Sequence, residues 1–229
     1  MLTDPPLLVV KKSWPRPDAS LLKRLAIAQT GHVCDAMDGR GALAPEIKAL
    51  IAGKERFIGT AITAECGPSD NLAIIAAVAR AKPGDVVVAA GDGFLHTAVV
   101  GDIVAMMAQN AKCAAILIDG MARDLIGLEG VGLPIYARGI TPNSCVRSGP
   151  GRVGFPVVCG GVPVASGDVI VADRDGAVVI PSARLAEVVA RVEAIVAAEA
   201  ETIAKVKTGW TSFPFMDEML ASDRVRLED

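Results

Sequence analysis

The sequence is poor in histidine and in aromatic residues. Its 229 residues include two histidines, and phenylalanine, tryptophan and tyrosine together make up 3% of the chain. Two histidines are too few for a three-histidine metal site, and they leave few ways to build a serine–histidine–aspartate triad. We therefore expect any catalysis to depend on carboxylates, and a core built from alanine, valine, isoleucine and leucine.

Long basic blocks and long apolar runs are also missing. The formal net charge is −3 and no basic block is longer than Lys11-Lys12, a pattern that predicts no contact with nucleic acid or with an anionic membrane. Glycine, aspartate or arginine interrupts every apolar run before the roughly 20 residues that a membrane-spanning helix needs. Apolar residues nevertheless make up 52% of the chain, with a mean hydropathy of +0.44. We interpret this excess as an interface between the subunits of a homo-oligomer.

Cysteine usage shows neither a disulfide framework nor a CxxC metal site. The cysteines are odd in number, dispersed, and mostly set among apolar neighbours: Cys34, Cys66, Cys113, Cys145 and Cys159. This pattern is typical of buried thiols in a reducing compartment. Residues 1–6 lack the basic and apolar regions of a secretory signal. The sequence therefore predicts a cytoplasmic protein.

Strand and helix patterns alternate along the first two thirds of the chain. Strands are expected at 57–66, 86–90, 114–118 and 133–138, and helices at 18–29, 71–82 and 102–110. Short valine-rich strands with glycine turns then predict a β-meander over 152–180, followed by an alanine-rich helix over 183–207. Because no linker-like composition separates these parts, we predict one α/β domain over 1–229 with a charged tail at 210–229.

Gly91-Asp92-Gly93 follows one of the predicted strands, as the loops of dinucleotide-binding folds do. The GxGxxG pattern is not completed, so nucleotide-dependent chemistry or methyl transfer is a weak alternative here. We expect instead a side-chain-poor rim at which the backbone can approach a ligand. His32 and His96 are interpreted as structural, hydrogen-bonded histidines.

Gly101-Asp102 begins one of the predicted helices. The amides of Ile103 and Val104 then belong to the first turn, where backbone N–H groups lack intrahelical acceptors. Together with the helix dipole, these amides can bind an anion such as a carboxylate. The simpler interpretation, which this motif alone favours, is that Asp102 caps the amides with its own carboxylate.

Arg123-Asp124 follows the strand predicted at 114–118, at the carboxyl end where α/β sheets usually carry their sites. Mg²⁺ and Mn²⁺ prefer oxygen ligands and retain several waters, so Asp124 with substrate and water would suffice to bind either. Arg123 could then bind a carboxylate or an enolate oxygen through its planar fork. The alternative is a surface ion pair in which Asp124 caps a helix.

The spacing of these residues carries a family resemblance. Asp102 is followed after twenty positions by Arg123-Asp124. Further motifs are Asp70-Asn71-Leu72-Ala73, Pro83-Gly84-Asp85-Val86-Val87-Val88, Gly139-Ile140-Thr141-Pro142, Gly160-Gly161-Val162 and Ala172-Asp173-Arg174-Asp175-Gly176. Over about residues 30–209, the chain resembles the RraA-like family, which includes 4-hydroxy-4-methyl-2-oxoglutarate aldolases.

The resemblance implies an α/β fold of stacked β-sheets flanked by helices, akin to the swivelling β/β/α domain. It also implies a homotrimer or homohexamer with active sites between subunits. The implied activity is that of a Mg²⁺- or Mn²⁺-dependent lyase, which cleaves 4-hydroxy-4-methyl-2-oxoglutarate or 4-carboxy-4-hydroxy-2-oxoadipate to pyruvate and a second 2-oxo acid. Oxaloacetate decarboxylation would pass through the same pyruvate enolate. The alternative is a non-catalytic regulator that binds ribonuclease E.

The resemblance further assigns roles to positions in this sequence. Gly101 to Val104 would bind the substrate carboxylate, and Arg123 would contact the substrate. Asp124 would bind the metal ion, and Asp102 would hold a water on it. These assignments imply that catalysis depends on Asp102 and Arg123.

The resemblance also covers residues around the site, and at one of them this chain departs from the family pattern. Asn71 and, from an adjacent subunit, Glu199 match residues that support the site through hydrogen bonds. The family often has an acidic residue three positions after the metal-binding aspartate, where this chain has Gly127. Glu129 is the nearest acid, so the metal affinity and the substrate are expected to depend on this change.

Overall fold

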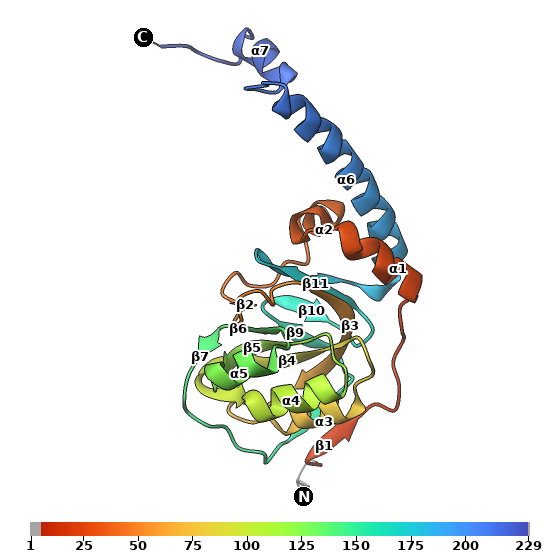
Figure 1. Ribbon diagram of the computed structural model, residues 1–229, viewed down its shortest axis with the longest axis vertical. Helices are drawn as coiled ribbons and strands as arrows, with labels where there is room; N and C mark the ends of the chain where they lie inside the picture. The colour runs from red at the N-terminus through yellow and green to blue at the C-terminus, as the bar shows by residue number, and fades with distance from the viewer. Residues whose placement is uncertain (1–5, 229) are drawn as a thin grey trace, which may run out of the picture.

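A parallel β-sheet with helices on one face forms the centre of the molecule, as Figure 1 shows. The structure is a computed structural model, and it describes residues 6–228. The central elements are β3 (Phe57–Glu65), α3 (Leu72–Arg80), β4 (Asp85–Val100), α4 (Asp102–Asn110), β5 (Ala115–Ala122), α5 (Leu125–Val131) and β6 (Ile135–Ala137). The strands pair in parallel in the order β3, β4, β5, β6. Since the helices return the chain to the start of each next strand, the carboxyl ends of the strands share one edge.

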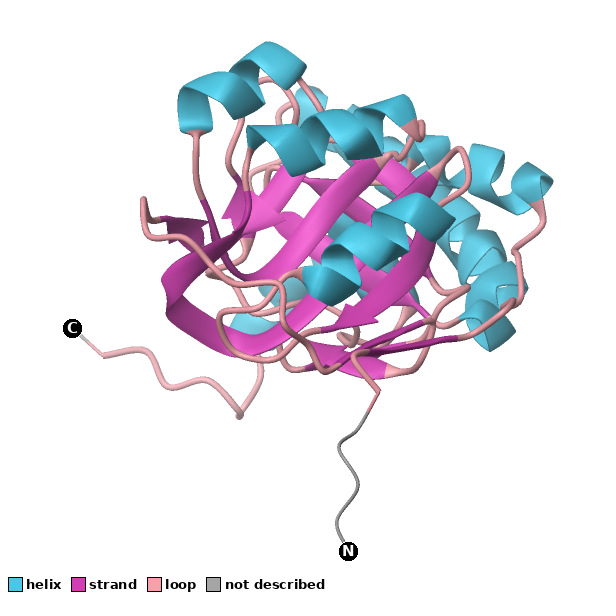
Figure 2. Cartoon of the chain, turned by 90° about the horizontal axis from the view of Figure 1, so that it is seen from below, coloured by secondary structure: helices cyan, strands magenta, loops and turns pink. Residues whose placement is uncertain are grey.

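The helices α3, α4 and α5 bury their apolar stripes against one face of this sheet (Figure 2). In α3, Ala73, Ile74, Ala77 and Val78 are buried, with the spacing of three and four residues that an amphipathic helix requires. Val104, Ala105 and Ala108 of α4 are buried in the same cluster. The central βαβ units predicted from the sequence are therefore confirmed.

A second layer of strands covers the opposite face of the sheet. β11 (Val169–Asp173) and β12 (Gly176–Ile180) form one antiparallel hairpin, and β9 (Val157–Cys159) and β10 (Val162–Val164) form another. β11 also pairs antiparallel with β3, so the sheet curls over itself. Because side chains alternate along a strand, Ile170 packs toward the parallel sheet while Val171 packs toward the outer helices.

Short strands complete the edges of the sheet. They are β1 (Leu8–Val10), β2 (Lys48–Ala49), β7 (Gly139–Ile140) and β8 (Gly151–Val153). β8 pairs antiparallel with β3 and in parallel with β1, whereas β2 pairs antiparallel with β6 and β7 continues beside β5. The loop between β7 and β8 therefore crosses the edge at which β4 and β5 end.

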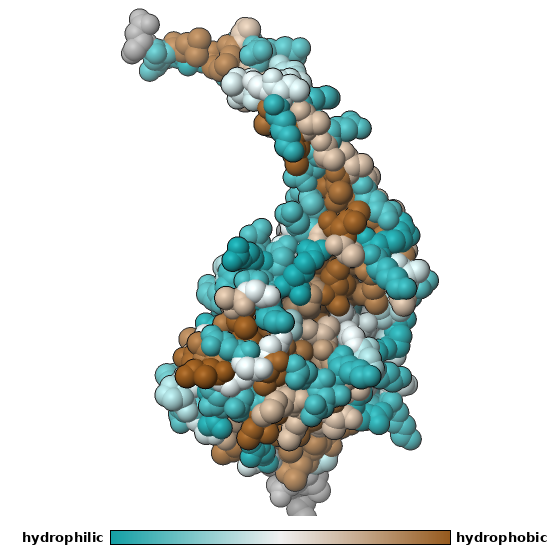
Figure 3. Space-filling view, viewed as in Figure 1, coloured by the Kyte–Doolittle hydropathy of each residue, from teal (hydrophilic) through white to brown (hydrophobic). Residues whose placement is uncertain are grey.

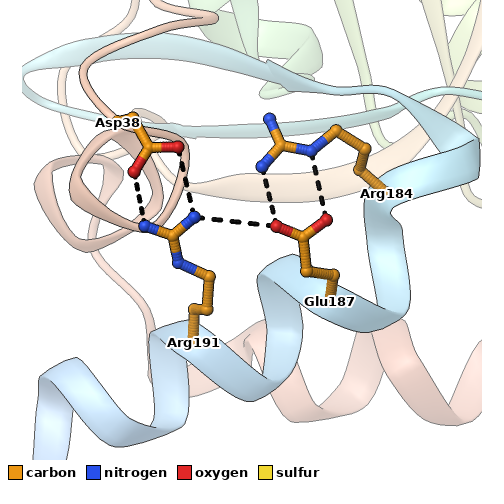
Figure 4. Close-up of polar contacts among 4 residues, drawn as sticks. All are labelled: Asp38, Arg184, Glu187 and Arg191. Atoms are coloured by element: carbon orange, nitrogen blue, oxygen red, sulfur yellow. Dashed lines mark hydrogen bonds and ion pairs between the residues drawn. The ribbon is translucent and has the colours of Figure 1, made fainter.

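Helices also cover the outer face of the β11–β12 hairpin. They are α1 (Ala19–Arg24), η1 (Leu25–Ile27), α2 (Thr30–Ala36), η2 (Ser182–Arg184) and the first half of α6 (Leu185–Lys207). Figure 4 shows the polar contacts that join α6 to the end of α2: Arg191 lies 2.6 Å from Asp38, and Glu187 bridges Arg191 and Arg184. Because water and salt screen these exposed pairs, they contribute little to stability, and the apolar contacts dominate. The predicted stacked sheets flanked by helices are confirmed.

The C-terminal arm, residues 200–228, projects from this body (Figure 1). It contains the end of α6 and α7 (Pro214–Leu220), and none of its residues is buried. Apolar residues lie on its surface (Figure 3), among them Ile203, Val206, Phe213, Phe215 and Leu220. Within residues 6–228, no helix combines the length and the apolarity that crossing a membrane requires.

β4 is much longer than the strand predicted at 86–90. It continues through Gly91-Asp92-Gly93, which the sequence suggested would form a flexible rim. Pairing with β5 resumes at Phe94 opposite Gly120 and again at Ala98 opposite Met121, with register shifts between them. Bulges in a paired strand therefore accommodate the glycines, and the expectation that this strand ends at residue 90 was wrong.

The predicted meander over 152–180 is wrong in its connections. β8 belongs to the edge beside β3, β9 and β10 form a separate sheet, and β11 joins β3. The turn residues were identified correctly and β9–β10 and β11–β12 are hairpins, but β8 and β11 also pair with strands that are distant in sequence. The tail at 210–229 also contains α7, and the first helix ends at Arg24, earlier than expected.

Candidate functional site

One cavity lies where β4 and β5 end and where α4 and α5 begin. Its volume is about 150 Å³, below the roughly 300–1,000 Å³ of pockets for drug-sized ligands, which suits a small organic acid. Its lining residues come from three segments and one loop: Asn71 and Ile75; Ala98 to Val104 and Met107; Arg123 and Asp124; and Ser144, Cys145 and Arg147. The cavity thus brings together Asn71, Asp102, Arg123 and Asp124, which are far apart in sequence.

The first turn of α4 presents backbone amides to this cavity. Gly101 is extended, with φ −127° and ψ −172°, and its carbonyl accepts the first helical hydrogen bond from Ala105. The Ile103 amide donates to Asp102 Oδ1 over 2.7 Å. Asp102 therefore caps one of the two amides considered from the sequence, as the simpler interpretation expected. A carboxylate ligand that replaced this contact would meet the positive end of the helix dipole.

Asp124 lies in a left-handed backbone conformation at the start of α5. Its φ is 60° and its ψ is 45°, a region that aspartate and asparagine tolerate better than most residues. Asp124 occupies the N-cap position of α5, as the alternative interpretation expected, but its side chain accepts no hydrogen bond from the amides of that helix. Asp124 Oδ2 lies 3.2 Å from Arg123 Nε, so the surface ion pair of that interpretation is present. Both side chains are about two fifths exposed, so this pair is weak and can rearrange around a ligand.

Two glycines allow the carboxylates to lie close to the backbone. A Cβ on Gly101 would collide with Asp124 Oδ2 and would lie 3.4 Å from Arg123 Cγ. A Cβ on Gly127 would lie 2.7 Å from Asp102 Cβ and closer still to its Oδ2. Neither glycine has a positive φ, so close approach rather than backbone conformation is the reason why a side chain is excluded here.

Asn71 brings an unpaired acceptor to the cavity. Its side-chain nitrogen donates to the Val99 carbonyl over 3.0 Å, and its backbone amide donates to the Val146 carbonyl. The residue is 4% exposed, and its Oδ1 has no hydrogen-bond partner in the described part of the chain. A buried acceptor without a donor is costly, which indicates that a water or a ligand donates to it.

Glu199 lies away from this cavity within one chain. It is on α6, and its carboxylate contacts His32 Nε2, while His32 Nδ1 accepts from the Gln29 amide. His32 is thus the hydrogen-bonded structural histidine expected from the sequence. No residue of α6 lines the cavity. Glu199 could approach such a site only in a neighbouring copy of the chain.

Asp119 has a structural role. It is buried, its Oδ1 accepts from Arg138 Nε over 2.5 Å, and its Oδ2 accepts from the Gly160 amide over 2.8 Å. These contacts tie β5 to the start of the second layer. The carboxylates that reach the cavity are therefore Asp102 and Asp124, as the sequence motifs indicated.

The loop after β7 supplies residues that the sequence motifs did not identify. Ser144, Cys145 and Arg147 line the cavity together with residues of α4. Burial raises the pKa of the Cys145 thiol, while the charges of Arg147 and Arg123 act in the other direction. A lone cationic residue in a stretch rich in turns has no periodic signal, so only the fold reveals it.

Comparisons with known proteins agree with the sequence motifs. The family model described as RraA-like, Aldolase/RraA, matches residues 30–179. A Halalkalibacterium halodurans protein named "Putative 4-hydroxy-4-methyl-2-oxoglutarate aldolase" is 36% identical over 152 residues, which are 66% of this chain and 72% of that protein.

Solved structures show the same relationship. An uncharacterized protein from Pseudomonas syringae is 28% identical with a TM-score of 0.76, over 86% of this chain and 97% of that one. Streptomyces coelicolor RraAS2, described as an unusual member of the RNase ES inhibitor RraA protein family, is 29% identical with a TM-score of 0.73, over 84% and 100% of the two chains. Since the family model matches well over half of its residues, the chain belongs to the RraA-like family.

Proposed function

We propose that this protein is a divalent-metal-dependent lyase that cleaves a carbon–carbon bond of a 2-oxo acid. The proposed substrates are 4-hydroxy-4-methyl-2-oxoglutarate and 4-carboxy-4-hydroxy-2-oxoadipate, which yield pyruvate and a second 2-oxo acid. The observation that carries this proposal is the meeting of Asp102, Arg123 and Asp124 with the amides of α4 around one small cavity. The name of the Halalkalibacterium relative supports the same activity.

The donor set fits a hard cation with few protein ligands. No group of three or more histidine, cysteine, aspartate or glutamate side chains suited to a metal ion occurs within residues 6–228. Mg²⁺ and Mn²⁺ commonly keep several waters and take one or two carboxylates. Asp124 would bind the ion directly, because its carboxylate is not used by α5. The unpaired Asn71 Oδ1 and the Asp102 carboxylate would accept hydrogen bonds from waters around it.

The chemistry of cleavage assigns a role to each side chain. When bound, the cation would act as a Lewis acid that polarises the C2 carbonyl. The Ile103 and Val104 amides would bind the C1 carboxylate at the start of α4. As the bond between C3 and C4 breaks, its electron pair moves onto C3 and the C2 oxygen, and Arg123 stabilises that developing enolate charge. A water held by Asp102 would take the C4 hydroxyl proton as the second carbonyl forms.

The decisive test is pyruvate release by the purified protein. We expect release from 4-hydroxy-4-methyl-2-oxoglutarate with Mg²⁺ or Mn²⁺, its loss with EDTA, and its recovery when excess Mg²⁺ is added. Oxaloacetate should also yield pyruvate, because loss of its C4 carboxylate forms the same enolate. Full turnover after metal removal would contradict the proposed metal dependence. No turnover of either substrate with Mg²⁺ would contradict the proposed activity.

The likeness to Streptomyces RraAS2 supports a second candidate, a non-catalytic regulator that binds ribonuclease E. The complete set of Asp102, Arg123 and Asp124 around the cavity favours the enzyme. Ribonuclease E inhibition without pyruvate release would favour the regulator instead.

We also propose that the working molecule is a cytoplasmic homo-oligomer, either a trimer or a hexamer. All five cysteines are free, which suits a reducing compartment. Exposed apolar side chains on α4 and α5, including Ile103, Met106 and Ile126, together with the C-terminal arm, offer surface for contact between copies. Light scattering at micromolar concentration should give a trimeric or hexameric mass, and a monomeric mass would contradict this.

A further inference from the structure

The cavity contains two guanidinium groups, and they differ in their partners. Arg123 lies 3.2 Å from Asp124, whereas Arg147 has no carboxylate within ion-pair distance in the part of the chain that the structure describes. Arg147 is an exposed residue of the β7–β8 loop, and it lines the cavity. A cation with no internal partner is available to pair with an anionic ligand.

The backbone on both sides of Arg147 is fixed. The Val146 amide donates to the Ser69 carbonyl over 2.8 Å, and the Val146 carbonyl accepts from the Asn71 amide over 3.1 Å. The Ser148 and Gly149 amides both donate to Asp70 Oδ2, and Asp70 is 4% exposed. The buried Asp70 carboxylate therefore holds the main chain that carries Arg147 beside the cavity, which reduces the entropy lost when a ligand binds.

The two arginines act on one region of the cavity. The positive charges of Arg147 and Arg123 both favour the thiolate of Cys145, although burial raises the pKa of that thiol overall. Cys145 and both arginines line the same cavity. An anion near Cys145 would therefore experience both charges, in a place where the walls partly exclude water.

Counting the charges of 4-hydroxy-4-methyl-2-oxoglutarate leaves one carboxylate without a partner. The C1 carboxylate is assigned to the amides of α4, the enolate oxygen to Arg123, and the cation to Asp124. A 4-hydroxy-2-oxo diacid also carries a distal carboxylate, which no group named so far would bind. Burying an unpaired carboxylate is unfavourable.

We propose that Arg147 binds the distal carboxylate and thereby selects dicarboxylic over monocarboxylic 2-oxo acids. This inference rests on the proposed function, because it assigns the rest of the substrate to the same cavity. Arg147 is a specificity residue in this account and takes no part in breaking the bond. The ligand chemistry is a 2-oxo acid with a second carboxylate two or three carbons from its carbonyl.

The experiment compares two ligands that cannot be cleaved and that differ at the distal end. 2-Oxoglutarate has the distal carboxylate, and 2-oxopentanoate has a methyl group in its place. By calorimetry with Mg²⁺ present, the wild type should bind 2-oxoglutarate at least about tenfold more tightly, the scale of one charge-assisted contact. Arg147→Gln should reduce that ratio below about threefold, and Arg147→Lys should retain part of it because a point charge lacks the planar fork.

A control of equal charge tests whether the effect is local. Arg174 is 85% exposed and pairs with Glu55 over 3.5 Å, and it does not line the cavity. Arg174→Gln should therefore keep the wild-type ratio. Thermal melting of each variant would exclude loss of fold as the cause of weaker binding.

The outcomes separate this inference from the proposed function. An unchanged ratio in Arg147→Gln, or no preference in the wild type, would overturn the role of Arg147 even if pyruvate release were normal. A preference that depends on Arg147 in a protein that releases no pyruvate would support the dicarboxylate site and would overturn the proposed lyase activity.

Discussion

Asp102 lies directly against Gly127, so that a Cβ at position 127 would come within 2.7 Å of Asp102 Cβ. Asp102 is the first residue of α4, and Gly127 lies in the first turn of α5. The orientation of the Asp102 carboxylate at the cavity therefore depends on the absence of a side chain on α5. Gly127 thus leaves the space that the Asp102 side chain occupies.

This contact predicts that Gly127→Ala will displace Asp102. Because the new methyl group would occupy the space of the carboxylate, kcat for pyruvate release should fall by about ten- to a hundredfold, a loss of about 1.4–2.7 kcal/mol of transition-state stabilisation. Gly130→Ala is the matched control, since nothing lies within 4 Å of a Cβ there on the same helix. It should leave kcat within about twofold and stabilise the fold slightly. Equal effects of the two variants would show that the contact has no role.

A second prediction concerns Asp70, whose carboxylate holds the backbone of the β7–β8 loop. Asp70 accepts hydrogen bonds from the amides of Leu72, Ser148 and Gly149. Asp70→Ala would leave these donors without their acceptor and should lower the free energy of unfolding by about 2–3 kcal/mol. Urea unfolding would measure this. Asp217→Ala, at an exposed position of α7, should change the unfolding free energy by less than about 0.5 kcal/mol.

Asp173 predicts a pH dependence of stability. Burial alone would raise the pKa of its carboxyl, but donors outweigh it, chiefly the Thr30 amide and hydroxyl at 2.7 Å, and bring the pKa below its ordinary value. A pKa lowered in the folded state gives stability that is present above the unfolded pKa, about 4, and is lost as the pH falls through the folded value.

The variant Asp173→Asn should test this directly. At pH 7 it should be less stable than the wild type by about 1–2 kcal/mol, which is less than a fully buried hydrogen bond to a charged group contributes because solvent screens this partly exposed carboxylate. The difference should narrow as the pH falls below about 4, because the wild-type carboxylate is then protonated. Urea titrations across this range would measure it. A difference that stays constant down to pH 2 would contradict a role for the charge.

The central part of the fold follows from local sequence signals. The apolar run at 114–118 and the helix at 102–110 were predicted within a few residues, because burial on both faces and a helical period leave clear patterns. The strand predicted at 86–90 ended too early, because Gly91-Asp92-Gly93 resembles a loop in sequence, whereas β4 extends to Val100. Its pairing with β5 depends on a partner strand that no local pattern reveals.

The part of the candidate site that depends on local sequence patterns could also be predicted, and the part that depends on long-range contacts could not. Asp102, Arg123 and Asp124 follow strands or begin helices at one sheet edge, so topology alone brings them together. Arg147 is different, because its position depends on hydrogen bonds from its loop to Asp70, Ser69 and Asn71. Its role has no local sequence signal. Glu199 lies outside the cavity of its own chain, and its predicted role depends on how copies assemble.

The roles of Arg123 and Asp124 are the central claim of the proposed function. Arg123→Ala should lower kcat by about a hundred- to a thousandfold, the scale of losing a donor to a developing oxyanion, while Mn²⁺ binding persists. Asp124→Asn is the better partner variant than alanine, because asparagine tolerates the left-handed backbone at this position.

The most direct test titrates Mg²⁺ against pyruvate release from 4-hydroxy-4-methyl-2-oxoglutarate for the wild type and both variants, with Mn²⁺ binding measured in parallel. We predict an unchanged metal midpoint with a low plateau for Arg123→Ala, and at least a tenfold higher midpoint for Asp124→Asn, since its direct ligand has lost its charge. A normal midpoint and normal Mn²⁺ affinity in Asp124→Asn, or loss of Mn²⁺ binding in Arg123→Ala, would contradict the assignment of metal and substrate to these two residues.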